Sequence, residues 1–398
     1  MRIGIYGGTF DPPHLGHREA ARAAMEHLSL DRLLLIPSRI PPHKVLPRGG
    51  AEGAARMAMT ALMADGLGPQ AEASPMEFLR EGYSYTVDTV KALRTQYPNG
   101  DFYLLMGTDM FLSFENWKDA SILAEEVTLT PFSREESDDR ERFARQGEHL
   151  AKTLGARVEI IPLPRRYPIS SSEIRCLLGR AETVEEGGHH LWAAVYGYIL
   201  THGLYGVEVD LKKLSNPQLR AVVASMMQAK RIPHVLGTEE TAAALAEHWG
   251  ADVALARRAA ILHDCTKYWS LSEHLALCEA YRISLTELER GSEKLLHAKT
   301  AAILAEHRFG EGPEVCAAIE CHTTGKPDMT TLDKVLYVAD YIEPNRSFPG
   351  VEALRCLSWG NLDQAMCAGI ETTIRELAKK RAPIHENTAM TLAQLKGT

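Results

Sequence analysis

The chain has 398 residues, of which 45% are hydrophobic and 24% charged, and its formal net charge is −8. This length is comfortable for two domains, and the composition is that of an ordinary globular protein. An acidic chain lacks the basic face that binding to a nucleic-acid backbone requires, so we do not expect nucleic acid as a partner.

The first half of the sequence alternates short apolar segments with helical ones. Strands are predicted at residues 3–6, 33–36, 102–106, 127–130 and 158–161, and a helix at residues 14–27. Strands separated by helices are typical of an α/β fold with a doubly wound parallel sheet. Ligands of such sheets bind at the carboxyl ends of strands, which here fall near residues 6–8, 36–38 and 106–109.

The pattern changes near residue 207. From residue 216 onward strand-like segments nearly vanish, and alanine-rich helical periodicity takes over, as in residues 241–247. We therefore predict an α/β domain at residues 1–207 and an all-helical domain at residues 208–398. The charged segment 133–145 is predicted to be a solvated helix or a surface loop.

Nothing in the sequence indicates export or a membrane. The N-terminal residues MRIGIY do not resemble a secretory signal, and the apolar segments are too short to cross a bilayer. The seven cysteines all occur at or after Cys176, and none forms a CxxC pair. They are typical of free thiols in a reducing compartment, so we expect a cytoplasmic protein.

Residues 7–17 read GGTFDPPHLGH and directly follow the first predicted strand. We expect Gly7 and Gly8 to let the backbone turn tightly and approach a phosphate. His14 and His17 share one face at the start of a helix, where the N-terminal N–H groups favour phosphate. Two imidazoles there can donate hydrogen bonds to a phosphoryl group as charge builds on its oxygens. Two histidines at this spacing are alone more often structural, whereas the full string is far more specific.

This string resembles the nucleotidyltransferase superfamily with the HxGH signature, and within it the bacterial nicotinate-nucleotide adenylyltransferases. Four later segments resemble that family in the same order: PPHK at 41–44, SYTVDT at 84–89, GTD at 107–109 with Trp117, and ISSSEIR at 169–175. Ser172 replaces the usual Thr of the last segment, and both residue types are suited to an N-cap. The resemblance covers about residues 1–205.

The resemblance implies a Rossmann-like fold and transfer of AMP from ATP to nicotinate mononucleotide in NAD biosynthesis. The products would be nicotinate adenine dinucleotide and pyrophosphate, and Mg²⁺ would accompany ATP. His14 and His17 would be catalytic, as stabilisers of the transition state. The residues expected to contact ATP are Gly7, Gly8, Thr9, Phe10, His14, His17, Gly107, Asp109, Ser171 and Arg175. The residues expected to contact the mononucleotide are Lys44, Tyr85, Thr86 and Trp117.

Each of these assignments has a simpler alternative. Lys44 suits a phosphate but also a solvated loop, Trp117 can stack on a heterocycle or fill the core, and Tyr85 can serve packing. Ser171 and Arg175 lie four apart, so one helix face can present both to a triphosphate. A related adenylyltransferase acting on phosphopantetheine is the rival, although residues 84–89 and Trp117 favour a pyridine mononucleotide. The sequence leaves the choice between nicotinate and nicotinamide open.

The helical half contains six residues of the types that bind metals. They are His234, His263, Asp264, His297, His322 and Asp340. Imidazole together with carboxylate suits Fe, Mn or Zn, and an open site can activate water and polarise a phosphoryl oxygen. A single His-Asp pair is weak evidence for a metal site, but six residues of these types rarely occur in this order by chance. We expect His248, His274 and His307 to be surface or packing residues.

The ordered set resembles the HD-domain metal phosphohydrolases. The flanking segments RIPH at 231–234, HTTG at 322–325 and ADYIEPNR at 339–346 resemble the bacterial symmetrical diadenosine tetraphosphate hydrolases, over about residues 210–395. The resemblance implies a dinuclear centre of Fe, with Mn or Zn as alternatives. One metal would be held by His234, His263, Asp264 and Asp340. The other would be held by Asp264, His297 and His322, with Asp264 bridging.

By charge and position, Lys267 is expected to be catalytic and Arg346 to contact phosphate, although either could be a solvated helix residue. The expected reaction is hydrolysis of a dinucleoside polyphosphate to two ADP, as a second activity of a bifunctional chain. The alternative is a non-catalytic module that binds metal and nucleotide and regulates the first domain. The expected partners are ATP, nicotinate mononucleotide and a dinucleoside polyphosphate, with no membrane; homo-oligomerisation stays open.

Overall fold

The computed structural model describes residues 1–42, 49–133 and 139–397. The chain forms two compact units, residues 1–208 and 209–398, which divide one residue after the expected position.

The first unit is built on a six-stranded sheet in the order β3-β2-β1-β4-β5-β6, in which every neighbouring pair is parallel. The strands are β1 (Arg2–Gly8), β2 (Arg32–Pro37), β3 (Ala71–Ala73), β4 (Asp101–Gly107), β5 (Val127–Phe132) and β6 (Arg157–Val158). The predicted doubly wound α/β fold is confirmed. β3 was not predicted, because its three half-buried residues carry no apolar pattern.

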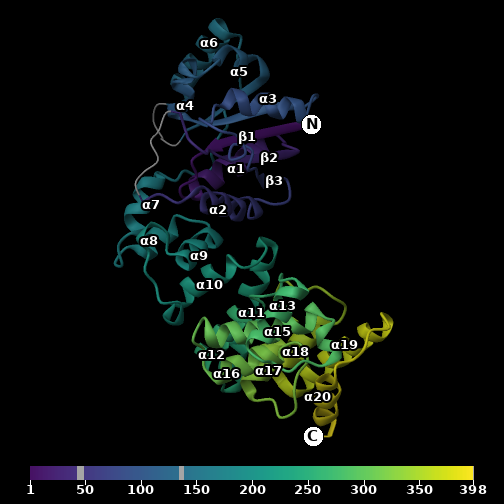
Figure 1. Ribbon diagram of the computed structural model, residues 1–398. Helices are drawn as coiled ribbons and strands as arrows, with labels where there is room; N and C mark the ends of the chain where they lie inside the picture. The colour runs from purple at the N-terminus through teal and green to yellow at the C-terminus, as the bar shows by residue number, and fades with distance from the viewer. Residues whose placement is uncertain (43–48, 134–138, 398) are drawn as a thin grey trace. The chain divides into compact units, whose positions relative to one another are not determined.

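Helices cover both faces of this sheet (Figure 1). The helices of this unit are α1 (Leu15–His27), α2 (Gly53–Asp65), α3 (Thr86–Gln96), α4 (Thr108–Leu112), α5 (Ala120–Glu126), α6 (Asp139–Leu154), α7 (Ser171–Leu178), α8 (Val184–His189) and α9 (Ala193–His202). Buried residues of α3, α5 and α6 join those of the central strands in one apolar cluster. The central strands are apolar along their length because both faces are covered.

The second unit is helical, as predicted, and no strand occurs among its described residues 209–397. Its helices are α10 (Asn216–Ala224), α11 (Ile232–Trp249), α12 (Val253–Leu262), α13 (Leu271–Ala280), α14 (Glu287–Arg290), α15 (Glu293–His307), α16 (Pro313–Cys321), α17 (Thr331–Ile342), α18 (Val351–Gly360), α19 (Leu362–Lys379) and α20 (Glu386–Gly397). Helices α11, α12, α15, α16 and α17 pack on one another. Within the described residues, no helix has the length and apolarity needed to cross a membrane.

Candidate functional site

A cavity of about 540 Å³ opens in the first unit where β1, β2 and β4 end. Because the carboxyl ends of parallel strands meet at one edge of the sheet, segments far apart in the sequence come together here. The predicted site residues that line it are Gly7, Gly8, Thr9, Phe10, His14, His17, Tyr85, Thr86, Gly107, Asp109, Trp117, Ser171 and Arg175. Lys44 lies outside the described residues.

Gly7 and Gly8 do not turn the chain, and that expectation was wrong. They continue β1, paired with Ile36 and Pro37 of β2. The left-handed backbone needed for the turn occurs instead at Phe10, with φ 48°. A Cβ on Gly7 would meet nothing within 4 Å. Gly7 therefore leaves open space at the end of the strand, on the wall of the cavity.

The geometry of α1 fixes the protonation sites of His14 and His17. His14 is the N-cap, and its Nδ1 accepts a hydrogen bond from the Gly16 N–H at 3.1 Å. The Nδ1 of His17 accepts from the His14 N–H at 3.2 Å. A neutral imidazole whose Nδ1 accepts carries its proton on Nε2. Both histidines line the cavity with their ring centroids 3.8 Å apart, so they bring two Nε2–H donors to one place.

Two buried residues that sequence reasoning missed hold the loop between β1 and α1. Asp11 is 2% exposed and accepts a hydrogen bond from the Tyr205 hydroxyl at 2.8 Å. Arg56 is also 2% exposed and donates to the carbonyl oxygens of Thr9 at 2.8 Å and Ser38 at 2.7 Å. Burial lowers the pKa of Arg56. Asp11 lies inside the recognised string, whereas Arg56 carries no sequence signal.

Ser171 and Arg175 of α7 contact this same loop. The Ser171 hydroxyl donates to the Pro12 carbonyl oxygen at 3.0 Å, and the Arg175 guanidinium donates to the carbonyl oxygen of Asp11. Both residues line the cavity. One face of α7 therefore brings a hydroxyl and a guanidinium to the wall of the cavity, beside the two histidines.

The N-cap of α7 is Ser170, not Ser172 as the sequence suggested. The Ser170 hydroxyl accepts from the Glu173 N–H, and the Glu173 carboxylate accepts from the Ser170 N–H, which forms a capping box. The hydroxyl of Ser172 instead accepts a hydrogen bond from Arg175 at 3.1 Å. The Ser-for-Thr exchange thus falls on a residue that contacts the arginine.

The N-terminus of α3 forms another part of the cavity wall. The helix begins at Thr86, and Tyr85 is its N-cap. The Lys118 ammonium lies 4.3 Å from the centre of the Tyr85 ring. Trp117 packs against the core, with its ring 5.6 Å from that of Phe114, and also lines the cavity. Trp117 therefore packs against the core and also lines the cavity, and its stacking on a heterocycle stays a prediction.

Glu77 is a further cavity residue that the sequence did not single out. It is 6% exposed, and one of its oxygens accepts a hydrogen bond from the Thr89 hydroxyl at 2.8 Å. Burial raises the pKa of the Glu77 carboxyl, against the opposing effect of this hydrogen bond.

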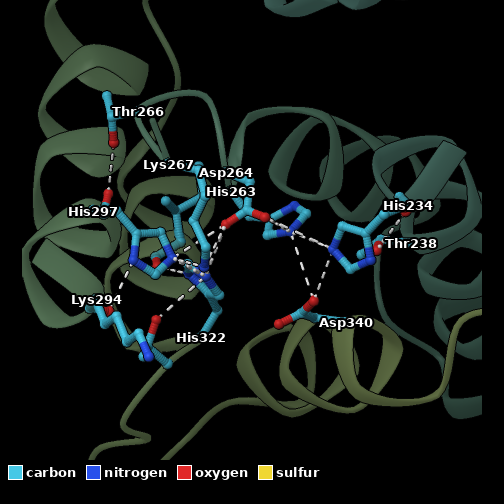
Figure 2. A network of polar contacts seen from close by, with 12 residues as sticks. His234, Thr238, His263, Asp264, Thr266, Lys267, Lys294, His297, His322 and Asp340 are labelled. Carbon is cyan, nitrogen blue, oxygen red and sulfur yellow. Dashed lines mark hydrogen bonds and ion pairs between the residues drawn. The ribbon is translucent and has the colours of Figure 1, made fainter. Parts of the chain in front are cut away.

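In the second unit, all six predicted metal ligands meet in one cluster (Figure 2). His234 lies on α11, His263 and Asp264 follow α12, His297 lies on α15, His322 follows α16 and Asp340 lies on α17. Ligand atoms within 4.8 Å of one another form three overlapping groups. They are His234, His263 and Asp264; His263, His322 and Asp340; and Asp264, His297 and His322. Distance alone therefore does not divide the ligands between two metals.

Three of the histidines are oriented by main-chain carbonyls. The Nδ1 atoms of His263, His297 and His322 lie 2.6, 2.8 and 2.6 Å from the carbonyl oxygen three residues earlier. Each Nδ1–H donates there, so each Nε2 offers a lone pair to the cluster. The Nε2 atoms of His297 and His322 are 3.1 Å apart, and those of His234 and His263 are 3.3 Å apart.

These separations fit a transition-metal centre. Two metal–nitrogen bonds of about 2.1 Å place their nitrogens about 3.0 Å apart at a right angle and about 3.4 Å apart at the tetrahedral angle. Asp264 is fully buried, and its Oδ1 accepts no hydrogen bond, although the His297 Nε2 lies 3.1 Å away and the Lys267 Nζ 3.3 Å away. The Lys267 ammonium donates to the His297 Nε2 at 3.1 Å, and the Thr323 hydroxyl lies 3.3 Å from the His322 Nε2. A metal ion would satisfy the buried oxygen and the converging lone pairs together.

The pKa directions of His322 and Asp264 suit metal ligands, whereas that of His263 does not, because burial would lower its pKa but Asp264 raises it. Burial, followed by the neighbouring His297 and His263, lowers the pKa of His322 to about 3. Burial alone would raise the pKa of Asp264, but His263 and His297 hold it well below its usual range. Metals bind neutral imidazole and ionised carboxylate, which these directions favour.

Three cations border the cluster. The Lys267 Nζ lies 3.1 Å from the His297 Nε2, and Arg346 donates to the Asp340 carboxylate at 2.6 Å. Arg231, which was not predicted as a site residue, donates through its Nε to the Asp264 Oδ2 at 2.7 Å. The three histidines that were expected to be surface or packing residues lie elsewhere: His248 is exposed, His274 is buried against Thr300, and His307 stacks on Tyr281.

Comparison with known proteins agrees with both parts of this description. Residues 5–177 match the family described as Cytidylyltransferase-like, and residues 231–345 match the family described as HD domain. The chain is 38% identical over 175 residues to a probable nicotinate-nucleotide adenylyltransferase of Dictyoglomus turgidum, covering 44% of this chain and 82% of the relative. It is 37% identical over 179 residues to the symmetrical bis(5'-nucleosyl)-tetraphosphatase of Bacillus subtilis, covering 45% of this chain and 96% of the relative.

A solved structure from Clostridium acetobutylicum, described as a predicted HD superfamily hydrolase involved in NAD metabolism, is 33% identical to this chain. It matches with a TM-score of 0.45, over 46% of this chain and 98% of that structure. The resemblance to two families that the motifs indicated is confirmed. The chain belongs both to the nicotinate-nucleotide adenylyltransferase family and to the HD-domain family of symmetrical bis(5'-nucleosyl)-tetraphosphatases.

Proposed function

We propose that the chain is bifunctional and that its first unit transfers AMP from ATP to nicotinate mononucleotide. The pair of Nε2–H donors that His14 and His17 bring to the cavity is the observation that supports this most directly. The mononucleotide phosphate would attack the α-phosphorus of ATP, and pyrophosphate would leave. As charge builds on the phosphoryl oxygens, the two imidazoles would donate to them without giving up a proton.

The remaining cavity residues would bind and orient the two substrates. Arg175 and Ser171 would face the phosphates from α7, and Lys44 stays a predicted phosphate contact. Mg²⁺ bound with ATP would offset the charge of its phosphates. Tyr85, Thr86 and Trp117 would surround the pyridine ring, which is why a mononucleotide is favoured over phosphopantetheine as the acceptor.

For the second unit, we propose hydrolysis of diadenosine tetraphosphate to two ADP. The buried cluster of four histidines and two aspartates supports a dinuclear centre. His234, His263, Asp264 and Asp340 would hold one ion, and Asp264, His297 and His322 the other, with Fe favoured over Mn or Zn. Such ions, when bound, activate water and polarise a phosphoryl oxygen. Lys267 and Arg346, at the border of the cluster, would contact the phosphates of the substrate.

The alternative is that the second unit binds metal and nucleotide without turnover and regulates the first. Convergence of the six ligand side chains fits both alternatives, since both bind metal. The lysine that lies 3.3 Å from the buried Asp264 oxygen is a cationic donor beside the metals, and it favours an enzyme.

Reciprocal variants of the full chain test both proposals. His17→Ala should lower kcat for adenylyl transfer about 100-fold to 1,000-fold and leave diadenosine tetraphosphate hydrolysis unchanged. His263→Ala should abolish hydrolysis and leave adenylyl transfer unchanged. A panel of nicotinate, nicotinamide and phosphopantetheine acceptors would identify the first substrate. If the wild-type chain holds metal but never hydrolyses diadenosine tetraphosphate, the regulatory alternative replaces the second proposal. If His17→Ala keeps full transfer activity, the first proposal is wrong in its catalytic residues.

A further inference from the structure

One buried carboxylate next to the metal cluster is not among the six ligands. Glu343 directly follows α17 and is 1% exposed. Its Oε1 accepts a hydrogen bond from the Nδ1 of His234 at 3.0 Å. Its Oε2 accepts two more from Asn345, from the main-chain N–H at 2.7 Å and from the side-chain amide at 2.9 Å. Both carboxylate oxygens are therefore engaged with donors.

His234 is the one described ligand histidine whose Nδ1 depends on a side chain. The other three donate to main-chain carbonyls, which no side-chain substitution removes. An Nδ1–H donated to Glu343 leaves the lone pair of His234 on Nε2. That Nε2 lies 3.0 Å from an Asp340 oxygen and 3.3 Å from the Nε2 of His263. The carboxylate thus decides whether the nitrogen of His234 that faces the cluster carries a lone pair or a proton.

The neighbouring helix is shaped to admit this carboxylate. Gly237 lies three residues after His234 on α11, and a Cβ on it would collide with the Oε2 of Glu343 and lie 3.0 Å from the side-chain nitrogen of Asn345. Gly237 lies in the interior of α11 without a positive φ, and glycine in that place lowers helix stability compared with alanine. The absence of a side chain at Gly237 is therefore explained by the Glu343 carboxylate, which occupies the adjacent space.

We infer that Glu343 is a positioning residue that fixes the tautomer and orientation of His234 for one of the two metals. This inference rests on the proposed dinuclear centre. A carboxylate that accepts from the outer nitrogen of a ligand histidine fixes its ring and raises its basicity, and its loss typically weakens metal binding by about 10-fold to 100-fold.

Glu343→Gln is a sharp test because an amide has only one acceptor oxygen. If that oxygen stays with the two donors of Asn345, the amide NH₂ faces His234, whose Nδ1 must then accept. The proton of His234 would move to Nε2, and the lone pair that faces the cluster would be lost. In the opposite orientation of the amide, its NH₂ would face the two N–H donors of Asn345. We therefore expect the orientation in which the NH₂ faces His234.

The experiment titrates the metal-free full chain with Mn²⁺ and counts the ions bound and their dissociation constants. The wild type should bind two ions. Glu343→Gln should bind one of them about 10-fold to 100-fold more weakly and keep the other, which Asp264, His297 and His322 hold. Glu289→Gln is the matched control, because the buried Glu289 lies 3.3 Å from the Nε2 of His385, a histidine outside the cluster. It should bind both ions like the wild type.

Nitrogen NMR of labelled histidine in the Zn²⁺-loaded chain gives a second measurement, because a bound ion occupies the Nε2 of His234 that otherwise lies 3.0 Å from the Asp340 carboxylate. The wild type should show His234 with its proton on Nδ1, and Glu343→Gln should lose this Nδ1–H signal. If Glu343→Gln does not fold, Gly237→Ala should displace the carboxylate and weaken the same ion. Two ions bound with unchanged constants in both variants would overturn the inference and leave the proposed centre intact. A wild type that binds no ion would overturn the proposed centre and this inference with it.

Discussion

The Nε2 atoms of His297 and His322 lie 3.1 Å apart, although the Nδ1 of each ring already donates to a main-chain carbonyl. Two lone pairs at this distance repel each other, and the Lys267 ammonium, 3.1 Å from the His297 Nε2, offsets this repulsion only in part. The main-chain hydrogen bonds thus hold the two rings in an arrangement that favours a bound ion over the metal-free state.

Metal removal should therefore destabilise the second unit. A ligand present at 100 times its dissociation constant stabilises the folded state by about 2.7 kcal/mol. We expect a chelator to lower the melting temperature of the full chain and Mn²⁺ to restore it, as followed by calorimetry. His322→Ala should lose most of this response. Equal melting temperatures with and without chelator would show that the cluster holds no ion.

Lys267 should act on the substrate and not on the metals. Its Nζ borders the cluster, 3.3 Å from the buried Asp264 oxygen, and its side chain is 32% exposed. Lys267→Met should lower the rate of diadenosine tetraphosphate hydrolysis on the order of 100-fold, because one cationic donor is lost. The number of bound metals, measured by elemental analysis, should stay at the wild-type value. A variant that loses metal as well would place Lys267 among the residues that hold the centre.

His17 should contribute through its Nε2–H. His17→Ala should lower kcat for adenylyl transfer about 100-fold to 1,000-fold, the effect of removing one donor to a developing charge. His17→Gln, whose amide nitrogen can take the place of Nε2, should recover part of the rate. Both variants should hydrolyse diadenosine tetraphosphate normally. Equal losses in the Gln and Ala variants would argue against the donor role.

The Tyr205–Asp11 hydrogen bond should stabilise the loop that presents His14. Burial, and then the charge of Asp11, raise the pKa of Tyr205, so its hydroxyl stays protonated and donates. Tyr205→Phe leaves a buried carboxylate oxygen with one donor fewer, which costs about 1–3 kcal/mol. Denaturant unfolding should show this loss, and kcat for transfer should fall. Tyr97→Phe, which removes a half-buried hydroxyl from Arg32, should cost less.

Glu77 should make stability depend on pH. Burial raises its pKa above the ordinary value of 4.5, so the folded state binds a proton more tightly than the unfolded state does. The stability that the protonated carboxyl contributes is present below pH 4.5 and is lost as the pH rises through the folded-state pKa. Glu77→Gln should therefore melt at a higher temperature than the wild type at pH 7 and at the same temperature near pH 4. A variant less stable than the wild type at pH 7 would contradict the burial effect.

By itself, the sequence determined the fold class of both units and the residue types of both sites. These signals are local: continuous apolar strands, the His-x-x-His start of α1, and ligand residues in a recognisable order. The turn expected at Gly7 and Gly8 was wrong, because the turn after β1 depends on Phe10 and on the buried Arg56 that binds the loop.

The tertiary structure alone decided how the sites are held. Asp11 meets Tyr205 across 194 positions, and His234 meets Glu343 across 109. Neither pair belongs to one local pattern, since a buried donor takes whichever acceptor the packing brings to it. The tautomers of the site histidines follow from the same contacts, because the partner of Nδ1 decides what Nε2 can do. The sequence determines which residues are present. Which atom donates and which accepts in each hydrogen bond is decided only when distant segments pack together.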